Sequence, residues 1–342
     1  MEEPYVRDIL EQPRALENTR EHLQASPALQ AIAARLRQGK FRQIVLTGMG
    51  ASYHALHPLN VALVDQGLPS VMLETSELIH YYRRLFDPGT LIIAVSQSGH
   101  SAEIVRLLQI NRRRAAILGV TNTPDSPLAR LAKAFVLTHA GNEFSVSCKT
   151  YLATLLALHW LQDLLFEKYS NHSTQTLALA EAAVSSYLDH WREHVYGLKQ
   201  QLAGARHLFL VGRGPSLAAV GTGALIVKEA AQFHAEGMSS AAFRHGPFEM
   251  LRRDVYVLVF AGPDETEALN GRLLRDIRQK KGRCALIGKR GKPNVFRLPP
   301  VPDRILPLLE ILPVQMISLA LAERAGKKPG CFVLASKVTR TE

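Results

Sequence analysis

A run of hydroxyl and amide side chains lies between an apolar segment and a helical one. The run SQSGHS, from Ser96 to Ser101, follows the apolar segment LIIAV and precedes the helical pattern AEIVRLLQI. Hydroxyls, an amide and free backbone N–H groups would therefore gather at a helix N-terminus, where hydrogen bonds and the helix dipole favour a phosphate. An ordinary helix cap needs only one of these hydroxyls. We therefore predict a phosphate site here, and we call this run the serine loop.

A second group of reactive side chains lies in the segment ALIVKEAAQFHAEGMSSAAFRHGP, residues 224–247. Acids and bases near a phosphate site suit proton transfer on a sugar phosphate. Spacing by itself does not select among them, and a single acid or histidine on a helix is more often a surface group. The candidates are Lys228, Glu229, His234, Glu236, Arg244 and His245. Near the C-terminus, Lys337 follows the apolar residues of CFVLAS, which would anchor a tail over a site or simply precede a frayed end.

An internal repeat indicates which elements position these groups. IVLTGMGAS at Ile44 and LFLVGRGPS at Leu208 share an apolar run, Gly-x-Gly and Ser, at an offset of 164 residues. The same offset carries LIIAVSQSGHSAEI onto VYVLVFAGPDETEA, and AAILGV corresponds to CALIG after about five inserted residues. This interpretation makes the chain a tandem duplication. At the serine loop the second copy has Phe260, Gly262 and Glu265, so the anion-binding chemistry is expected only once.

The fold class follows from the form of each copy. Continuous apolar runs such as VYVLVF are typical of strands buried on both faces, and the segments between them have helical period and length. We predict an α/β fold with parallel sheets flanked by helices, and ligands at the carboxyl ends of the strands. The two Gly-x-Gly turns do not predict dinucleotide binding, because Tyr53 and Leu217 occupy the place of the third glycine. Ser52 is better interpreted as a further polar contact to a small ligand.

Composition excludes several classes of protein. Of 342 residues, 47% are hydrophobic and 21% charged, which excludes a disordered or collagen-like chain. Three scattered cysteines favour neither a disulfide framework nor a zinc cluster. Neither a signal peptide nor a membrane span is apparent, so we expect a cytoplasmic protein. The net charge of +11 is spread out, without a nucleic-acid motif. We predict no metal, no cofactor, no nucleic acid and no membrane partner.

The motifs GMGASYHA, LETSEL, SQSGHSAEI and KEAAQFHAE…FRHGP, in this order, resemble those of the double-domain sugar isomerase (SIS) proteins. The nearest pattern is the isomerase half of glutamine–fructose-6-phosphate aminotransferase, over essentially the whole chain. The resemblance implies two tandem SIS domains, each a flavodoxin-like three-layer α/β/α unit. The expected parts are an N-terminal helical segment at 1–30, the first SIS domain at 31–169, a helical connector at 170–202, the second SIS domain at 203–325 and a tail over the site at 326–342.

The resemblance also implies roles for individual residues. Glu229 would move a proton between C1 and C2 of the sugar, and His245 would open the ring from across a dimer interface. Lys337 would close over the open-chain sugar. A shared site of this kind implies a homodimer. The residues expected to hold the sugar phosphate are Ser52, Ser96, Gln97, Ser98 and Ser101.

Departures from the synthase pattern point away from its full reaction. The start MEEPY has no N-terminal cysteine, so we expect no glutaminase domain. Ile226 and Ala242 replace a lysine and an acidic residue, the loop AGNEFSVSCKTY is one residue shorter, and PGCF stands where a Pro-Arg pair is usual. We therefore predict an isomerase or deaminase for an aminated hexose 6-phosphate of the glucosamine 6-phosphate type. The alternatives are a fructosamine-6-phosphate deglycase, a plain aldose–ketose isomerase and a non-catalytic sugar-phosphate sensor.

Overall fold

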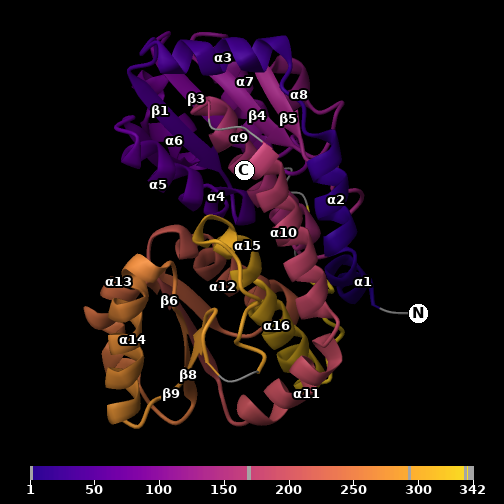
Figure 1. Cartoon of the computed structure of the whole chain (residues 1–342), viewed down its shortest axis with the longest axis vertical. Helices are drawn as coiled ribbons and strands as arrows, with labels where there is room; N and C mark the ends of the chain where they lie inside the picture. Colours follow the sequence, from indigo (N-terminus) through magenta and orange to yellow (C-terminus); the bar gives the residue numbers. More distant parts are fainter. Residues whose placement is uncertain (1–2, 168–170, 292–293, 335–336, 338–342) are drawn as a thin grey trace. The chain divides into compact units, whose positions relative to one another are not determined.

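Two parallel β-sheets organise the chain (Figure 1). The computed structural model describes residues 3–167, 171–291, 294–334 and 337. The first sheet has the strand order β2-β1-β3-β4-β5, which is the flavodoxin-like order. Its strands are β1 (Gln43–Gly48), β2 (Ser70–Glu74), β3 (Thr90–Val95), β4 (Ala116–Thr121) and β5 (Ala134–Leu137).

The second sheet repeats this order as β7-β6-β8-β9, which confirms the duplication and the predicted fold class. Its strands are β6 (His207–Gly212), β7 (Ala235–Ser239), β8 (Val255–Phe260) and β9 (Arg283–Ile287). In each sheet, the first strand in sequence is the second in space, and all strand pairs are parallel.

The strand registers correct the offset predicted from the sequence. Gln43 of β1 pairs with Thr90 of β3, whereas His207 of β6 pairs with Val255 of β8. Strand β8 therefore lies one residue later than the offset of 164 predicts, because one extra residue separates β6 from β7. The structural counterpart of Ser96 is Ala261 rather than Phe260: each backbone N–H bonds to the adjacent strand's end, at Val120 and Ile287 respectively. Strand β9 lies three residues later than the offset of 164 predicts from β4, and not about five residues later.

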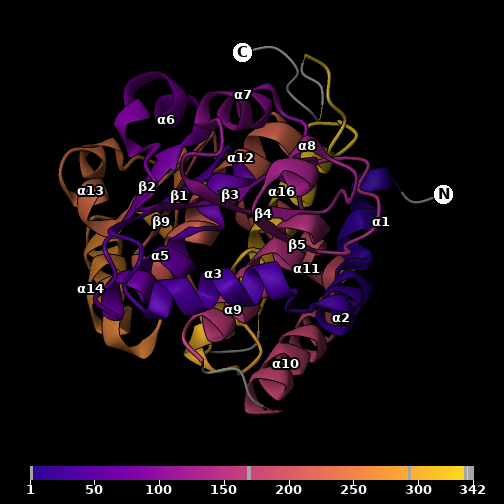
Figure 2. The ribbon, with the colours of Figure 1, turned by 90° about the horizontal axis from the view of Figure 1, so that it is seen from above.

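Helices cover both faces of the first sheet, giving the predicted three layers (Figure 2). Three of them lie on one face: α3 (Pro27–Arg37), α5 (His57–Asp65) and α9 (Lys149–Leu165). The opposite face carries α6 (Thr75–Tyr81), α7 (Ala102–Asn111) and α8 (Pro127–Leu131). Local sequence explains their starts: Ser26 and Ser126 each accept a hydrogen bond from a first-turn backbone N–H and precede a proline at the first helical position.

The second sheet is covered in the same way (Figure 1). Helices α12 (Leu217–Ala231) and α16 (Leu312–Arg324) pack together on one face, with α11 (Trp191–Gln201) against α16. The other face carries α13 (Ser240–Arg244) and α14 (Asp264–Gln279). The remaining helices are α1 (Pro4–Leu10), α2 (Gln12–His22), α4 (Ala51–His54), α10 (Asn171–Leu188) and α15 (Leu306–Glu310).

The chain forms two compact units, one around each sheet. The first-sheet unit comprises Arg14–Glu143, Lys149–Ala178 and, near the C-terminus, Lys337. The described residues of the second-sheet unit are 3–13, 144–148, 179–291 and 294–334. The boundary between the units falls within α10, and the N-terminal helix α1 belongs to the second-sheet unit. The domain bounds that the resemblance implies stay predictions. Of the tail predicted at 326–342, residues 335–336 and 338–342 lie outside the described residues.

Apolar strands and helices form the two cores. Every residue of β3 and β8 is buried, as their continuous apolar runs predict. Each fully buried Val, Leu, Ile or Phe stabilises the fold by about 1.5–3 kcal/mol. The stretch Asp303–Arg324 is long and apolar enough to cross a membrane, yet its apolar window is 100% buried within the protein. It is therefore a core helical segment of the second-sheet unit.

Candidate functional site

The serine loop lies at the carboxyl edge of the first sheet, as predicted for a ligand site. Ser96 follows β3 directly, is 8% exposed, and donates its backbone N–H to Val120 of the neighbouring strand β4. Gly99 adopts a left-handed conformation with φ +62°. A Cβ at Gly99 would lie 2.3 Å from the Oγ of Ser126, so the loop packs too closely against α8 for any other residue.

The hydroxyls of the serine loop have different partners. The Oγ of Ser96 accepts a hydrogen bond from the backbone N–H of Gly99 at 3.1 Å, and that of Ser98 accepts one from His100 at 3.2 Å. Ser101 is the N-cap residue of α7, but its side chain makes no capping hydrogen bond. Two hydroxyls thus shape the loop, while that of Ser101 stands at the helix N-terminus without the capping role. This arrangement leaves an anion the place that a side-chain cap usually takes.

Ser52 approaches the same edge from the neighbouring strand. It lies in α4 after β1, and β1 pairs directly with β3. Gly50 has φ +54° at the N-cap of α4, and a Cβ at Gly48 would lie 3.0 Å from Val95 O and from backbone atoms of α4. The tight turn thus explains the glycine at position 50, and the close packing explains the glycine at position 48. Tyr53 occupies the position where a dinucleotide-binding turn has its third glycine. Burial raises the pKa of the Tyr53 hydroxyl, and the nearby charge of Glu74 acts in the same direction.

Glu103 is a polar residue of this edge that the sequence analysis did not single out. It lies in the first turn of α7 and is 7% exposed. Its Oε2 is buried without a hydrogen-bond partner. A carboxylate in the first turn of a helix is stabilised by the helix dipole. Its position beside the serine loop makes it a candidate acceptor for ligand hydroxyls. In the sequence, its position two residues after Ser101 was the feature that could have identified it.

Hydrogen bonds and a short stretch of backbone connect the serine loop to Lys337. The backbone N–H of Asn122 donates to Gln97 O at 2.9 Å, and its Nδ2 donates to Gly141 O at 2.8 Å. Two residues further on, Glu143 accepts the ammonium of Lys337 at 2.9 Å. The side chain of Glu143 is fully buried. The fold therefore brings Lys337 and the serine loop into one network, which passes through two residues that the sequence analysis did not assign.

The Glu143 carboxylate is held on both of its oxygens. Thr150, at the start of α9, donates its backbone N–H to Oε1 at 3.0 Å and its hydroxyl to Oε2 at 2.6 Å. A buried carboxylate costs free energy unless hydrogen bonds and a cation compensate it. Thr150 and Lys337 supply that compensation, so the position of the Lys337 ammonium is determined by a rigid partner. The side chain of Lys337 remains 24% exposed.

Glu229 and His245 belong to the second-sheet unit. Glu229 is half-buried in the last turn of α12, and His245 is exposed directly after α13. Helix α12 passes β7 closely, since a Cβ at Gly237 would lie 2.5 Å from Val220 O, and then continues to the amino edge of the sheet. Helix α13 follows the carboxyl edge of β7. The two side chains therefore lie toward opposite edges, separated by a five-residue strand of roughly 15 Å.

The corresponding edge of the second sheet is closed by the protein's own carboxylates. Asp303 accepts the backbone N–H of Asp264, the first residue of α14, at 3.0 Å. Burial would raise the pKa of Asp303, but hydrogen bonds from Lys289 and this N–H lower it. The first turn of α14 also carries Glu265 and Glu267. No hydroxyl occurs in the loop 261–263.

Glu310 adds a buried acid to this second edge. Its Oε1 accepts the hydroxyl of Ser216 at 2.8 Å, and its Oε2 is buried without a partner. Burial raises the pKa of Glu310 to about 7, and the nearby charge of Asp303 acts in the same direction. Ser216 is the counterpart of Ser52 in the repeat, so the same position contacts an internal carboxyl in the second copy. Among the described residues, no group of three or more His, Cys, Asp or Glu side chains is arranged to hold a metal ion.

Comparison with known proteins follows the same two segments. A family model described as the SIS domain matches residues 38–162 and 201–322. A glutamine–fructose-6-phosphate aminotransferase (isomerizing) from Pyrococcus horikoshii is 29% identical over 345 residues, covering 95% of this chain and 55% of that protein. The chain thus spans about half the length of this curated relative.

Two solved structures share the whole architecture. One, from Silicibacter pomeroyi DSS-3, is provisionally named a phosphosugar isomerase; it is 28% identical with a TM-score of 0.81, covering 95% of this chain and 99% of that one. The other is the C-terminal domain of glucosamine-fructose-6-phosphate aminotransferase from Francisella tularensis. It is 23% identical with a TM-score of 0.83, covering 96% of this chain and 98% of that one, and this likeness concerns the fold alone.

Proposed function

We propose that this chain, which belongs to the SIS-domain family, is a sugar-phosphate isomerase that acts on an aminated hexose 6-phosphate and releases its amine. The observation that carries the proposal is the serine loop at the N-terminus of α7, whose cap residue Ser101 uses no side-chain hydrogen bond for capping. The names of the relatives at 28–29% identity support a phosphosugar as the substrate class. Cytoplasmic location belongs to the same proposal.

The substrate phosphate binds the serine loop in this proposal. Ser98 and Ser101 donate hydroxyl hydrogen bonds to it, and the N-terminal N–H groups of α7 face its charge. Ser52 and Gln97 contact the phosphate or the adjacent sugar hydroxyls from the same edge. Hydrogen bonds to a charged group contribute about 1.5–3 kcal/mol each, so a few of them suffice for recognition.

Glu229 is the base of the proposed reaction. As a carboxylate it removes the proton from C2 of the open-chain amino sugar and returns it to C1. The C1 oxygen gains the proton that the amino nitrogen loses, so that C1 becomes a hydroxymethyl carbon and the amine-bearing C2 becomes an imine. Water adds to the imine carbon, ammonia leaves, and a 2-keto sugar phosphate remains. Positioned acid–base groups of this kind typically contribute about 10²–10⁴-fold in rate.

His245 opens the sugar ring from a second copy of the chain. Its exposure and its distance from Glu229 along the second sheet support a site shared between subunits. A homodimer with two shared sites follows from this arrangement. In the same proposal Lys337, oriented by Glu143, covers the open-chain sugar from the tail.

An ammonia-release assay with glucosamine 6-phosphate tests this function. The parent protein is expected to release ammonia, and Glu229→Gln to lower kcat by about 10²–10⁴-fold while substrate binding persists. Glu236→Gln, an equal change at a half-exposed residue of β7, is the matched control and should keep full activity. Retention of most activity by Glu229→Gln would contradict the assignment of the base.

The products distinguish the other candidate reactions. Free amino acid from an amino-acid-linked fructosamine 6-phosphate, without ammonia from glucosamine 6-phosphate, would indicate the deglycase. Interconversion of unaminated aldose and ketose phosphates would indicate the plain isomerase. Tight binding of fructose 6-phosphate, with no turnover of any of these substrates, would replace the enzyme with a sensor.

A further inference from the structure

A basic pocket lies at the opposite end of α7 from the serine loop. We propose that it binds a small organic polyphosphate, with phosphates against arginine side chains and an apolar or planar group against its hydrophobic wall. Helix α7 is ten residues long, or about 15 Å. The pocket is therefore separate from the sugar-phosphate site, and the proposal does not depend on the proposed function.

The pocket has the size of a small-molecule site. Its volume is about 590 Å³, within the range of roughly 300–1,000 Å³ that ligand pockets occupy. All of its lining residues belong to the first-sheet unit. They come from α3, the loop before β3, the end of α7 and the turn after it, β4, the end of α8 and the residues that follow α8. Six of them are basic: Arg35, Arg112, Arg113, Arg114, Arg130 and Lys133. None of its lining residues carries a carboxylate.

Few of these charges are neutralised by the protein. Among the described residues, Arg130 is the only one of these six that forms an ion pair. It lies 3.6 Å from Asp125, and both side chains are exposed. Arg35 lies over the ring of Phe41 at 4.7 Å, which leaves its charge uncompensated. Cationic residues are favoured at a helix C-terminus by the dipole, which accounts for Arg35 in α3, Arg112 at the end of α7 and Arg130 in α8. It does not account for the other three basic residues of the pocket.

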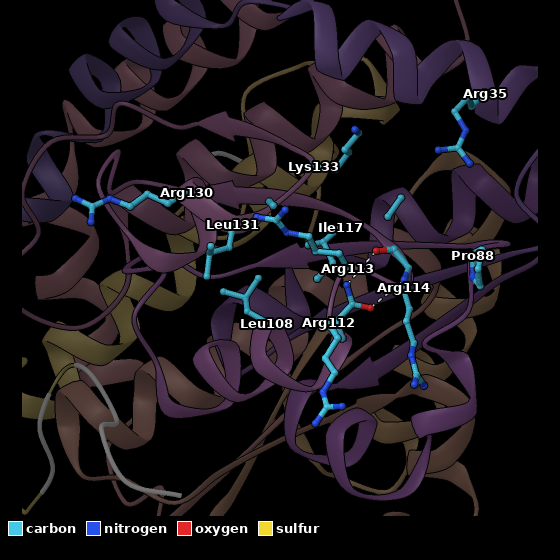
Figure 3. Close-up of a pocket in the computed structure, with 14 residues that line it drawn as sticks. Arg35, Pro88, Leu108, Arg112, Arg113, Arg114, Ile117, Arg130, Leu131 and Lys133 are labelled. Atoms are coloured by element: carbon cyan, nitrogen blue, oxygen red, sulfur yellow. Dashed lines mark hydrogen bonds between the residues drawn. The ribbon is translucent and has the colours of Figure 1, made fainter.

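A smaller pocket of about 370 Å³ adjoins this one and shares Arg112 and Arg114 with it. Its lining is Arg83, Arg106, Gln109, Ile110, Arg112 and Arg114. Figure 3 shows Arg112 and Arg114 extending to one side of the turn and Arg113 toward the other. Arg112 and Arg114 can thus contact successive phosphates, since guanidinium groups bind phosphate oxygens through paired N–H donors.

The turn that carries the three arginines is held in a defined conformation. The buried side chain of Asn111 donates to Ala115 O and accepts its N–H, both at 3.0 Å. Arg112 and Arg113 have φ of 45° and 62°, a left-handed region that glycine or asparagine usually occupies. Arginines therefore occupy positions at which the backbone conformation favours small residues. Such a departure from local preference is expected where the side chains bind a ligand.

The rest of the lining indicates the kind of ligand. Leu108, Ile117 and Leu131 give the larger pocket an apolar wall, whereas arginines dominate the smaller one. A nucleoside triphosphate matches this division in size and chemistry. A flat nucleic-acid surface would need basic residues along an extended face together with aromatic residues for stacking, and the two linings contain no aromatic residue.

Calorimetric titration of the full chain with adenosine 5′-triphosphate at physiological salt tests the proposal. The Arg112→Ala/Arg114→Ala double variant is expected to weaken binding at least tenfold, because two charge-assisted contacts are lost. The matched control is Arg272→Ala/Arg275→Ala, which removes the same charge from the exposed side of α14 and should change binding less than twofold. Circular dichroism and thermal unfolding confirm that both variants fold.

Several outcomes would overturn the proposal. These are absence of ATP binding at physiological salt, equal weakening in both double variants, or tighter binding of a DNA duplex or polyglutamate than of ATP. Inorganic tripolyphosphate is the second probe, and we expect it to bind at least fivefold more weakly than ATP because it cannot use the apolar wall. Equal affinity of the two probes would overturn the assigned role of that wall.

Discussion

The carboxyl edges of the two sheets have the same backbone plan and opposite chemistry. In the first, β3 leads into a loop of hydroxyls, and the side chain of the N-cap residue Ser101 does not cap α7. In the second, β8 leads into a loop without hydroxyls, and the N-terminus of α14 receives the carboxylate of Asp303. A helix N-terminus attracts one negative group. The second copy supplies that group itself, whereas the first leaves the place to a ligand.

In the proposed function, this difference explains how a duplicated fold provides a single anion site. Parallel sheets place every loop of this kind at the same edge, so the fold offers two equivalent positions. Lys289 bonds to Asp303 and lies 3.7 Å from Asp264, which stabilises the internal carboxylates at the second position. A phosphate there would meet carboxylates at the helix N-terminus. Under this proposal, side-chain chemistry rather than topology selects the copy that binds the phosphate.

The largest expected effect comes from giving the first edge the acid of the second. Ser101→Asp places a carboxylate at the N-cap of α7, where it caps the helix and repels a phosphate. Loss of one charge-assisted hydrogen bond and the added repulsion should weaken fructose 6-phosphate binding by about 10³-fold, roughly 4 kcal/mol. Calorimetric titration measures this. Thr266→Asp, at the counterpart in α14, is the control, and an equal loss there would contradict the distinction between the two edges.

The second expected effect concerns the pH dependence of stability. The pKa of Glu310 is raised from 4.5 to about 7 in the folded protein, so the folded state binds more protons between these values. Stability should therefore fall as pH rises from about 4.5 to 7 and level off above, by up to about 3 kcal/mol from this group. Urea unfolding of the parent and of Glu310→Gln across pH 5–8 measures the difference.

The amide variant sharpens the assignment to Glu310. Glutamine cannot ionise, so this part of the pH slope should disappear and Glu310→Gln should be more stable than the parent at pH 8. If the parent and the variant show the same slope from pH 5 to 7, the titration of another group is responsible. Sugar-phosphate binding should be unaffected, since Glu310 belongs to the second edge.

The smallest expected effect distinguishes the glycines of the two loops. Gly99→Ala meets both an unfavourable φ and the Oγ of Ser126, so it should cost about 2 kcal/mol of stability and also weaken sugar-phosphate binding. Gly262→Ala meets an unfavourable φ of +74° and the Thr266 hydroxyl at 2.9 Å, so it should also lower stability, but it should leave sugar-phosphate binding unchanged. Gly39→Ala has φ +66° in open space and isolates the conformational cost, about 1 kcal/mol.

Local patterns carried much of the fold. The apolar runs and the Gly-x-Gly turns located the strands, and the repeat predicted two similar sheets, which the strand orders confirm. The offset was wrong by one residue at β8, because periodicity of a buried strand does not specify its register against a neighbour. The serine loop was predictable because its groups are adjacent in sequence. The structure places this loop at the carboxyl edge of the first sheet, whereas the phosphate-binding roles of its residues and of Ser52 stay predictions. The assigned roles of Glu229, His245 and Lys337 stay predictions as well.

The sequence by itself determined what depends on neighbouring residues: which segments form strands and helices, that the fold is duplicated, and where hydroxyls gather. Only the tertiary structure decided what depends on distant ones. Asp303 caps a helix that begins at Asp264, and Glu143 holds Lys337 from far along the chain. Long-range hydrogen bonds leave no periodic trace in the sequence, because each partner alone is an ordinary polar residue. The contrast between an open and a closed helix N-terminus therefore required the folded protein.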